Sequence, residues 1–263
     1  QMGLSVLHRL PDLLRENDWC VTVLLGWRNG TTEIVDIEPG DTSASNFGVA
    51  VDIGTTTVVA HLVNLATAET LSTKAKYNSQ VAFGDDVIAR IMCASSPQRR
   101  RGMRELMVDD LNDLITALVV DAGAKLSDVT YVVCAGNTTM IHFLYGLDPA
   151  QIRRSPYVPC AACPPVIRAA EVGVGIHKRG LLAVLPAVAS YVGGDVVADV
   201  LVSGMMESED VSLLIDLGTN GELVLGNADW LVCCSASAGP AFEGGGITCG
   251  MRATDGAIGR GDG

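Results

Sequence analysis

The 263-residue chain is poor in aromatic residues, poor in basic residues and without a long apolar run. Aromatic residues make up 5% of it beside 29 glycines, which favours a compact α/β protein with many tight turns over an aromatic-rich β-sandwich. Lys and Arg number 18 against 30 Asp and Glu, giving a net charge of -12. Because a nucleic-acid surface needs a dense basic face, we expect no nucleic-acid partner.

Long hydrophobic segments are also lacking. The longest nearly apolar stretch is the twelve residues from Leu181 to Val192, and it contains Pro186. A helix that spans a bilayer needs roughly 18 or more apolar residues. The N-terminal segment has no basic start, apolar stretch and cleavage site of the kind that marks a signal peptide. We therefore expect a soluble, cytoplasmic protein with no membrane partner.

The eight cysteines form no ligand set typical of an iron-sulfur cluster. Cys160 and Cys163 have a C-x-x-C spacing, but three prolines surround them and no second pair repeats the spacing. A metal site there is the weaker interpretation, and free thiols in a reducing cytoplasm are the stronger one. Cys233 and Cys234 would point to opposite sides if their segment is a strand.

Residues 1–46 are too few to fold well alone. Their pattern predicts a helix over 4–16 and strands over 20–25 and 33–37. Residues 38–43 are dense in turn formers and mark a boundary. We interpret 1–46 as the end of a preceding domain or as a linker that packs on the domain after it.

Strand and helix patterns alternate in the rest of the chain, which predicts an α/β domain over 47–263. A turn is expected over 216–221, and Asp195 is expected as an N-cap. The predicted strands are 48–53, 58–65, 129–134, 182–188, 211–215 and 222–225, and the predicted helices are 85–95, 102–124, 140–145 and 196–201.

Two segments, Val51–Thr55 and Ile215–Thr219, share the frame apolar, Asp, apolar, Gly, Thr at a separation of 164 residues. In each segment the aspartate ends a buried strand, and the glycine lets backbone N–H groups approach an anion closely. One such segment is more often a plain hairpin turn, but two copies after buried strands favour phosphate binding. No G-x-x-x-x-G-K-[ST] motif and no kinase-type glycine-rich loop competes with this interpretation.

Together with these turns, further segments resemble the superfamily of acetate kinase, sugar kinases, heat-shock chaperones and actin. Within it, the sequence is similar to the reductive activators of corrinoid-dependent enzymes over about 47–258. The segments that carry this resemblance are 52–57, 77–80, 83–88, 136–140, 193–195, 216–222 and 238–244.

The resemblance implies an α/β, actin-like (RNase H-like) two-lobed ATPase core with mixed sheets flanked by helices. The first lobe would cover about 47–190, and the start of a second, incomplete lobe about 191–263. Only 47 residues follow Asp216, so we expect the chain to be an excerpt of a longer protein. Residues 238–246 would line the cleft or a partner surface, or serve as a glycine-rich connector.

The resemblance also implies site residues, with ATP and Mg²⁺ as cofactors. Asp52, Asp195 and Asp216 are the expected catalytic residues, and Asp52 and Asp216 would hold Mg²⁺ through water. For Asn137, a role as a helix cap is an equal alternative. The expected nucleotide-binding residues are Gly54, Thr55, Thr56, Thr57, Asn137, Thr138, Gly218, Thr219, Asn220 and Gly221.

The function implied by the resemblance is ATP-driven reduction of an inactive Co(II) corrinoid to Co(I). The expected partner is a corrinoid protein of a methyltransferase or O-demethylase system, and a homodimer is one expected arrangement. Family members usually carry an iron-sulfur domain, so a cluster is expected in the full-length protein but not in this chain. The alternatives are a small-molecule kinase, an activator of a 2-hydroxyacyl-CoA dehydratase, and a nucleotide-independent scaffold for a corrinoid protein.

This cysteine pattern generates a first prediction. The isolated 263-residue chain should contain no stoichiometric iron or acid-labile sulfide, because neither the Cys160 and Cys163 pair nor the Cys233 and Cys234 pair completes a cluster ligand set. Metal analysis and a visible absorption spectrum after anaerobic purification would measure this. A bound cluster would contradict the interpretation of these four cysteines.

Overall fold

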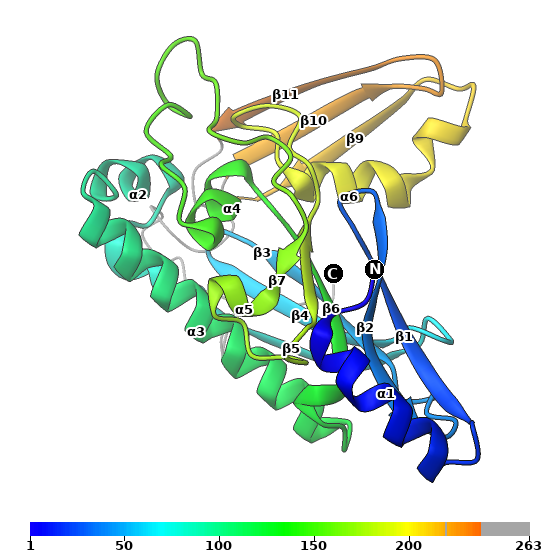
Figure 1. The fold of residues 1–263 in the computed structure, drawn as a ribbon. Coiled ribbons are helices and arrows are strands. Elements are labelled where there is room, and N and C mark those ends of the chain that lie inside the picture. Colours follow the sequence, from blue (N-terminus) through cyan, green and yellow to red (C-terminus); the bar gives the residue numbers. More distant parts are fainter. Residues whose placement is uncertain (219, 238–263) are drawn as a thin grey trace, which may run out of the picture.

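The structure, a computed structural model, describes residues 1–218 and 220–237. Its central element is a six-stranded mixed sheet of strand order β5-β4-β3-β6-β8-β7, in which β3, β6 and β8 run parallel and the other neighbours antiparallel (Figure 1). The strands are β3 (Phe47–Ile53), β4 (Thr57–Asn64), β5 (Thr70–Tyr77), β6 (Val129–Gly136), β7 (Ile167–Arg168) and β8 (Leu181–Val184).

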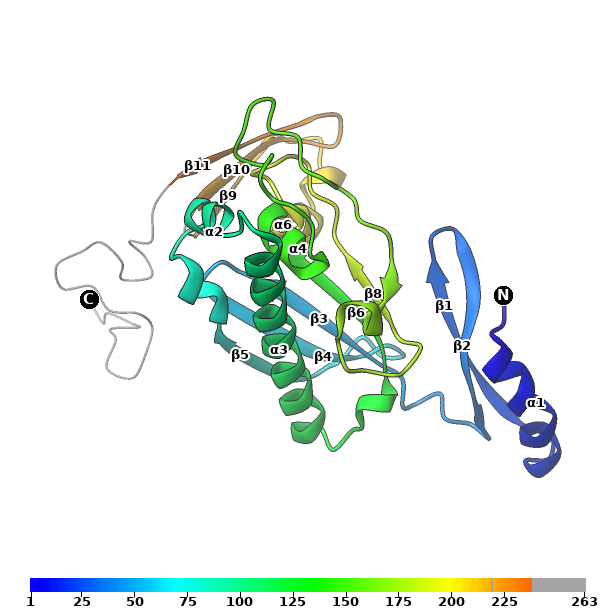
Figure 2. The same ribbon diagram turned by 60° about the vertical axis from the view of Figure 1, so that its left-hand side comes forward.

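Helix α3 (Pro97–Asp121) covers one face of this sheet and lies across β3, β4 and β5 (Figure 2). Ser96 caps the helix by accepting a hydrogen bond from the N–H of Arg99, and proline suits the first helical turn. Leu111 and Ile115 are fully buried against the strands. Burial of one such side chain contributes about 1.5–3 kcal/mol, so this face holds the first lobe together.

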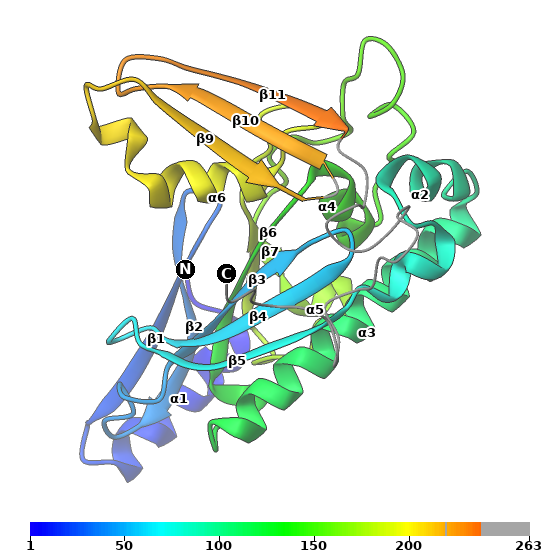
Figure 3. The same cartoon turned by 180° about the vertical axis from the view of Figure 1, so that it is seen from behind.

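A second, antiparallel sheet has the order β11-β10-β9. Its strands are β9 (Ser212–Leu217), β10 (Asn220–Gly226) and β11 (Leu231–Ser237). Helix α6 (Gly194–Ser203) contacts both β9 and β6, and so lies between the two sheets (Figure 3). Its buried side chains Val196 and Val200 pack with Val224 of β10. This small apolar cluster fixes α6 on the three-stranded sheet.

The shorter helices are α2 (Val87–Cys93), α4 (Thr138–Tyr145) and α5 (Ala169–Val172). Helix α4 follows β6 directly and is almost entirely buried. Asn137 caps it by accepting a hydrogen bond from the N–H of Met140, and Gly146 ends it in the left-handed conformation. Within the described part of the chain, no helix is both long enough and apolar enough to cross a membrane.

The N-terminal residues form helix α1 (Leu4–Glu16) and a hairpin of β1 (Val21–Arg28) and β2 (Thr31–Pro39), to one side of the six-stranded sheet (Figure 2). Polar contacts attach the hairpin to the first lobe. Arg179 donates to the carbonyl oxygens of Val35 and Ile34 at 2.7 and 3.3 Å. The Asp36 carboxylate accepts from Arg9 at 2.7 Å and from His177 at 3.0 Å.

Several predicted elements differ from the structure. Helix α6 begins at Gly194 with Gly193 as its N-cap, so the prediction of Asp195 as the cap is wrong, and Asp195 lies in the first turn instead. The predicted turn over 216–221 is also wrong at both ends, because β9 continues to Leu217 and β10 begins at Asn220. The predicted strand over 182–188 ends earlier, at Val184, two residues before Pro186, which lacks a backbone donor.

The buried carboxylate of Asp36 generates a pH prediction. Burial alone raises its pKa, but the hydrogen bond from the N–H of Ile37, together with His177 and Arg9, outweighs it and lowers the pKa below 3.8. A lowered folded-state pKa gives stability that is present above the unfolded value and lost as pH falls through the folded value. Asp36→Asn should therefore cost about 1–3 kcal/mol of unfolding free energy at pH 7 and much less below pH 3.8.

Urea unfolding of both proteins at a series of pH values would measure this difference. The exposed Asp12, which pairs with Arg15 on the surface at 3.5 Å, provides the matched control, and Asp12→Asn should have little effect. A stability loss in Asp36→Asn that does not change with pH would contradict the assignment.

Candidate functional site

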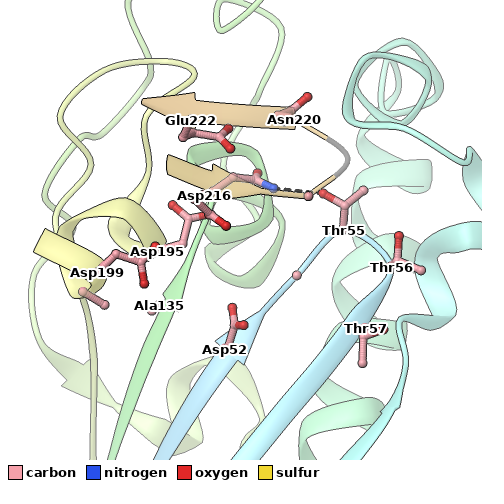
Figure 4. Close-up of a pocket in the computed structure, with 14 residues that line it drawn as sticks. Asp52, Thr55, Thr56, Thr57, Ala135, Asp195, Asp199, Asp216, Asn220 and Glu222 are labelled. Carbon is pink, nitrogen blue, oxygen red and sulfur yellow. Dashed lines mark hydrogen bonds between the residues drawn. The ribbon is translucent and has the colours of Figure 1, made fainter. Parts of the chain in front are cut away.

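An open cleft of about 450 Å³ lies where the two sheets meet (Figure 4). One wall is the turn that joins β3 to β4, and the opposite wall is α6 with the first two strands of the second sheet. The lining residues are Asp52, Gly54, Thr55, Thr56, Thr57, Ala135, Asn137, Asp195, Ala198, Asp199, Asp216, Gly218, Asn220 and Glu222.

The turn between β3 and β4 is held tightly by its neighbours. A Cβ on Gly54 would lie 2.5 Å from the carbonyl oxygen of Thr57, so only glycine fits this turn. Asn78 donates from its side chain to the carbonyl oxygen of Gly54 at 2.9 Å and from its N–H to that of Thr56 at 2.8 Å. On the cleft side, the amide of Asn137 donates to the Thr55 hydroxyl at 3.1 Å. These contacts hold the turn from both sides.

Five carboxylates converge on the cleft from four elements: Asp52 (β3), Asp195 and Asp199 (α6), Asp216 (β9) and Glu222 (β10). Asp195 and Asp199 lie one helical turn apart and therefore share a face of α6. Asp216 and Glu222 are direct partners across the β9–β10 ladder. Figure 4 shows Asp52 pointing across the cleft toward Asp195 and Asp216.

The protein and the neighbouring negative charges raise the pKa of four of these groups. The pKa of Asp52 is raised mainly by desolvation and further by repulsion from Asp216 and Asp199. This carboxylate nevertheless stays open to solvent through the cleft. Desolvation also raises the pKa of Asp195 to about 6 and that of Glu222 to about 7, against opposing hydrogen bonds. The pKa of Asp199 rises for the same reason, with Asp216 adding to it. Such a concentration of shifted carboxylates is typical of a cation or reaction site.

Most of the residues predicted from sequence lie at this cleft. Thr138 does not line it, because its hydroxyl is buried and donates to the carbonyl oxygen of Ala189 at 2.7 Å. Gly221 is on β10 but does not line the cleft either, and Thr219 lies outside the described residues. The predicted residues that do line the cleft are Asp52, Gly54, Thr55, Thr56, Thr57, Asn137, Asp195, Asp216, Gly218 and Asn220.

Sequence reasoning missed Asp199 and Glu222 as site residues. A signal for each was present: Asp199 follows Asp195 by four positions on a predicted helix, which puts both on one face. Glu222 ends the second phosphate-type motif, and alternation along its strand puts it on the same face as Val224.

The donor chemistry of the cleft fits a hydrated magnesium ion better than a fully protein-coordinated metal. Mg²⁺ usually binds through one or two carboxylates and keeps several waters. Among the described residues, no cluster of three or more His, Cys, Asp or Glu side chains has the arrangement of a direct metal site. Asp52 and Asp216 both face the cleft and can accept hydrogen bonds from metal-bound water.

Three family models match the chain. They are described as the RACo linker region over residues 1–44, the RACo middle region over 47–208, and the C-terminal domain of RACo, the ASKHA domain, over 210–261. ASKHA denotes the acetate kinase, sugar kinase, heat-shock chaperone and actin superfamily, so the actin-like fold class is confirmed.

Individual proteins are similar too. A solved structure of a reductive activator for corrinoid, iron-sulfur protein superposes with a TM-score of 0.91 at 44% identity, covering 98% of this chain and 41% of that one. The corrinoid activation enzyme RamQ of Eubacterium limosum is 34% identical over 86% of this chain and 38% of its own. A [Co(II) methylated amine-specific corrinoid protein] reductase of Methanosarcina barkeri is 27% identical over 81% of this chain and 40% of its own. The chain thus spans about two fifths of the length of these relatives.

The raised pKa of Glu222 generates a prediction about stability and pH. Because its pKa rises from 4.5 to about 7 on folding, the folded state holds a proton that the unfolded state releases. Stability should therefore fall by about 1–3 kcal/mol as pH rises from 4.5 to 7 in the absence of ligands. Glu222→Gln should reduce this slope, while the exposed Glu105→Gln should keep it. Chemical unfolding across this pH range measures the slope, and equal slopes in all three proteins would refute the prediction.

Proposed function

Since the chain belongs to the RACo family, we propose that it provides the nucleotide cleft of an enzyme that reductively activates a corrinoid protein. The observation that carries this proposal is the cleft, in which Asp52 and a glycine turn with three threonines face four further carboxylates. The names of the relatives, a corrinoid activation enzyme, a corrinoid protein reductase and a reductive activator, support the same reaction.

In this proposal, the two walls of the cleft bind different parts of Mg-ATP. The turn offers backbone N–H groups and hydroxyls of Thr55, Thr56 and Thr57 to phosphate oxygens. The opposite carboxylates repel a bare triphosphate, so the nucleotide has to bring cations with it. Asp52 and Asp216 would orient the water shell of Mg²⁺, which would neutralise phosphate charge when bound.

Asp195 is the proposed proton acceptor for the water that attacks the terminal phosphate. Its pKa of about 6 is close to neutral, which suits a general base that is ionised before the reaction and can take up a proton. The N–H of Val196 donates to its carboxylate at 2.9 Å and fixes one oxygen. The other oxygen remains available to the cleft.

We propose that ATP supplies free energy and not electrons. Nucleotide that binds two lobe arrangements with different affinity can shift the equilibrium between them, and this difference can drive an unfavourable electron transfer that reduces Co(II) to Co(I). The electron itself would come from an iron-sulfur domain that these 263 residues do not encode. The partner would be a corrinoid protein of a methyltransferase or O-demethylase system in a reducing cytoplasm.

Removing either aspartate of the two motifs tests the proposal. Asp52→Asn and Asp216→Asn in the full-length protein should lower ATP-dependent formation of Co(I) by about tenfold or more, because each loses an oxygen charge that orients the metal. The matched control is Asp109→Asn, an exposed carboxylate of α3 that does not line the cleft. Circular dichroism would verify that all variants fold.

Corrinoid absorbance and phosphate release should be followed together. Loss of both in the two cleft variants, with both retained in Asp109→Asn, supports the proposal. Unchanged Mg-ATP turnover in either cleft variant would refute the assigned cleft. Corrinoid reduction that proceeds equally without ATP would instead favour a nucleotide-independent scaffold.

A further inference from the structure

Arg90 of helix α2 is a fully buried arginine directly behind the turn that lines the cleft. Its guanidinium donates to the carbonyl oxygen of Thr55 at 2.7 Å and to that of Gly84 at 2.8 Å. A third contact is to the sulfur of Met140 at 3.6 Å. Arg90 does not line the cleft itself, and one residue of the turn separates it from the cleft.

The charge of Arg90 has no carboxylate partner among the described residues. The negative charges that act on Arg90 are those of Asp85 and Asp86, and both side chains are exposed. Asp86 also caps α2 by accepting a hydrogen bond from the N–H of Ala89 at 2.7 Å. Burial lowers the pKa of Arg90 to about 10, so the group still carries its charge at neutral pH. A buried cation without a counter-ion is unfavourable unless another group supplies the missing charge.

The hydrogen bonds around the turn determine where an anion would meet this charge. In a trans peptide, the C=O of one residue and the N–H of the next point in opposite directions. The carbonyl oxygens of Gly54 and Thr56 are bonded to Asn78, and that of Thr55 to Arg90. The N–H groups that come after these carbonyls therefore point away from Asn78 and Arg90.

We propose that Arg90 is a positioning residue whose counter-charge is the phosphate bound on the other side of the turn. The inference rests on the proposed nucleotide site and adds to it a specific source of anion affinity. The positive charge acts through the Thr55 peptide group, polarising it and attracting the anion across a single layer of backbone that excludes water. A purely structural arginine would need only its hydrogen bonds, whereas this role needs the charge.

Two substitutions separate the charge from the hydrogen bonds. Arg90→Gln keeps N–H donors but is neutral, and Arg90→Lys keeps a charge with fewer donors. Calorimetric titration of the full-length protein with Mg-ATP and with inorganic triphosphate should show about tenfold or greater weakening for Arg90→Gln and at most about threefold for Arg90→Lys. The control is Arg101→Gln, an exposed arginine in the first turns of α3, which should bind like wild type.

A second pair of variants keeps Arg90 in place. Met140→Glu would supply an internal counter-ion next to the guanidinium, and Met140→Gln is its neutral match. If the ligand phosphate is the missing counter-charge, Met140→Glu should bind both ligands about tenfold more weakly than Met140→Gln. This comparison remains informative even if the Arg90 variants fail to fold.

The outcomes distinguish this inference from the proposed function. If wild type binds Mg-ATP, and the two Arg90 variants bind it equally well, as do the two Met140 variants, the role of Arg90 is overturned and the nucleotide cleft remains in place. If wild type binds inorganic triphosphate but not Mg-ATP, and the variants rank as expected, the role of Arg90 is supported and the proposal that the ligand is a nucleotide is refuted. Failure of wild type to bind either ligand would overturn both.

Discussion

The geometry of the cleft depends on one close approach of backbone to backbone between the lobes. A Cβ on Gly193 would lie 2.5 Å from the carbonyl oxygen of Gly136, at the end of β6, and would also collide with the backbone of Asn137. Any side chain at Gly193 would thus push the start of α6 away from the six-stranded sheet. Since α6 carries Asp195 and Asp199, their distance from the turn between β3 and β4 is set by the absence of a single methyl group.

This approach creates a cleft with opposite electrostatic character on its two walls. The wall formed by α6, β9 and β10 is rich in carboxylates, and two of them, Asp195 and Glu222, have a pKa raised to about 6 and about 7 by burial and by repulsion from neighbouring aspartates. The facing wall offers the N–H groups of the turn, with the charge of Arg90 behind them. A ligand that is anionic on one side and carries a cation on the other matches both walls, and neither half alone does. Magnesium bound to a triphosphate has this character.

The sequence was sufficient to predict the strands that lead into the two Asp-x-Gly-Thr segments, because the apolar runs of β3 and β9 and the recurring frame are local signals. The expectation that both strands are buried is wrong for β9, where Leu213, Ile215 and Leu217 are exposed. It was insufficient for β5, whose segment Thr70–Tyr77 is a polar edge strand that is stabilised by pairing with β4 and not by its own pattern. The N-cap prediction at Asp195 failed for a tertiary reason. The contact of Gly193 with β6 lets the helix start earlier than its capping signal indicates, and this leaves the carboxylate free to face the cleft.

Tertiary contacts also explain why some segments that resemble the family never reach the cleft. Asn78 belongs to the segment 77–80, and it donates to two carbonyl oxygens of the turn between β3 and β4. The segment 83–88 contains Gly84, where a Cβ would come within 2.7 Å of that of Ala89, and its carbonyl oxygen holds the side chain of Arg90 in place. Both segments therefore act through the turn: they fix its carbonyls on one side so that its N–H groups are presented on the other. A motif search that considers only residues lining the cleft would overlook them, although the orientation of the turn between β3 and β4 depends on both.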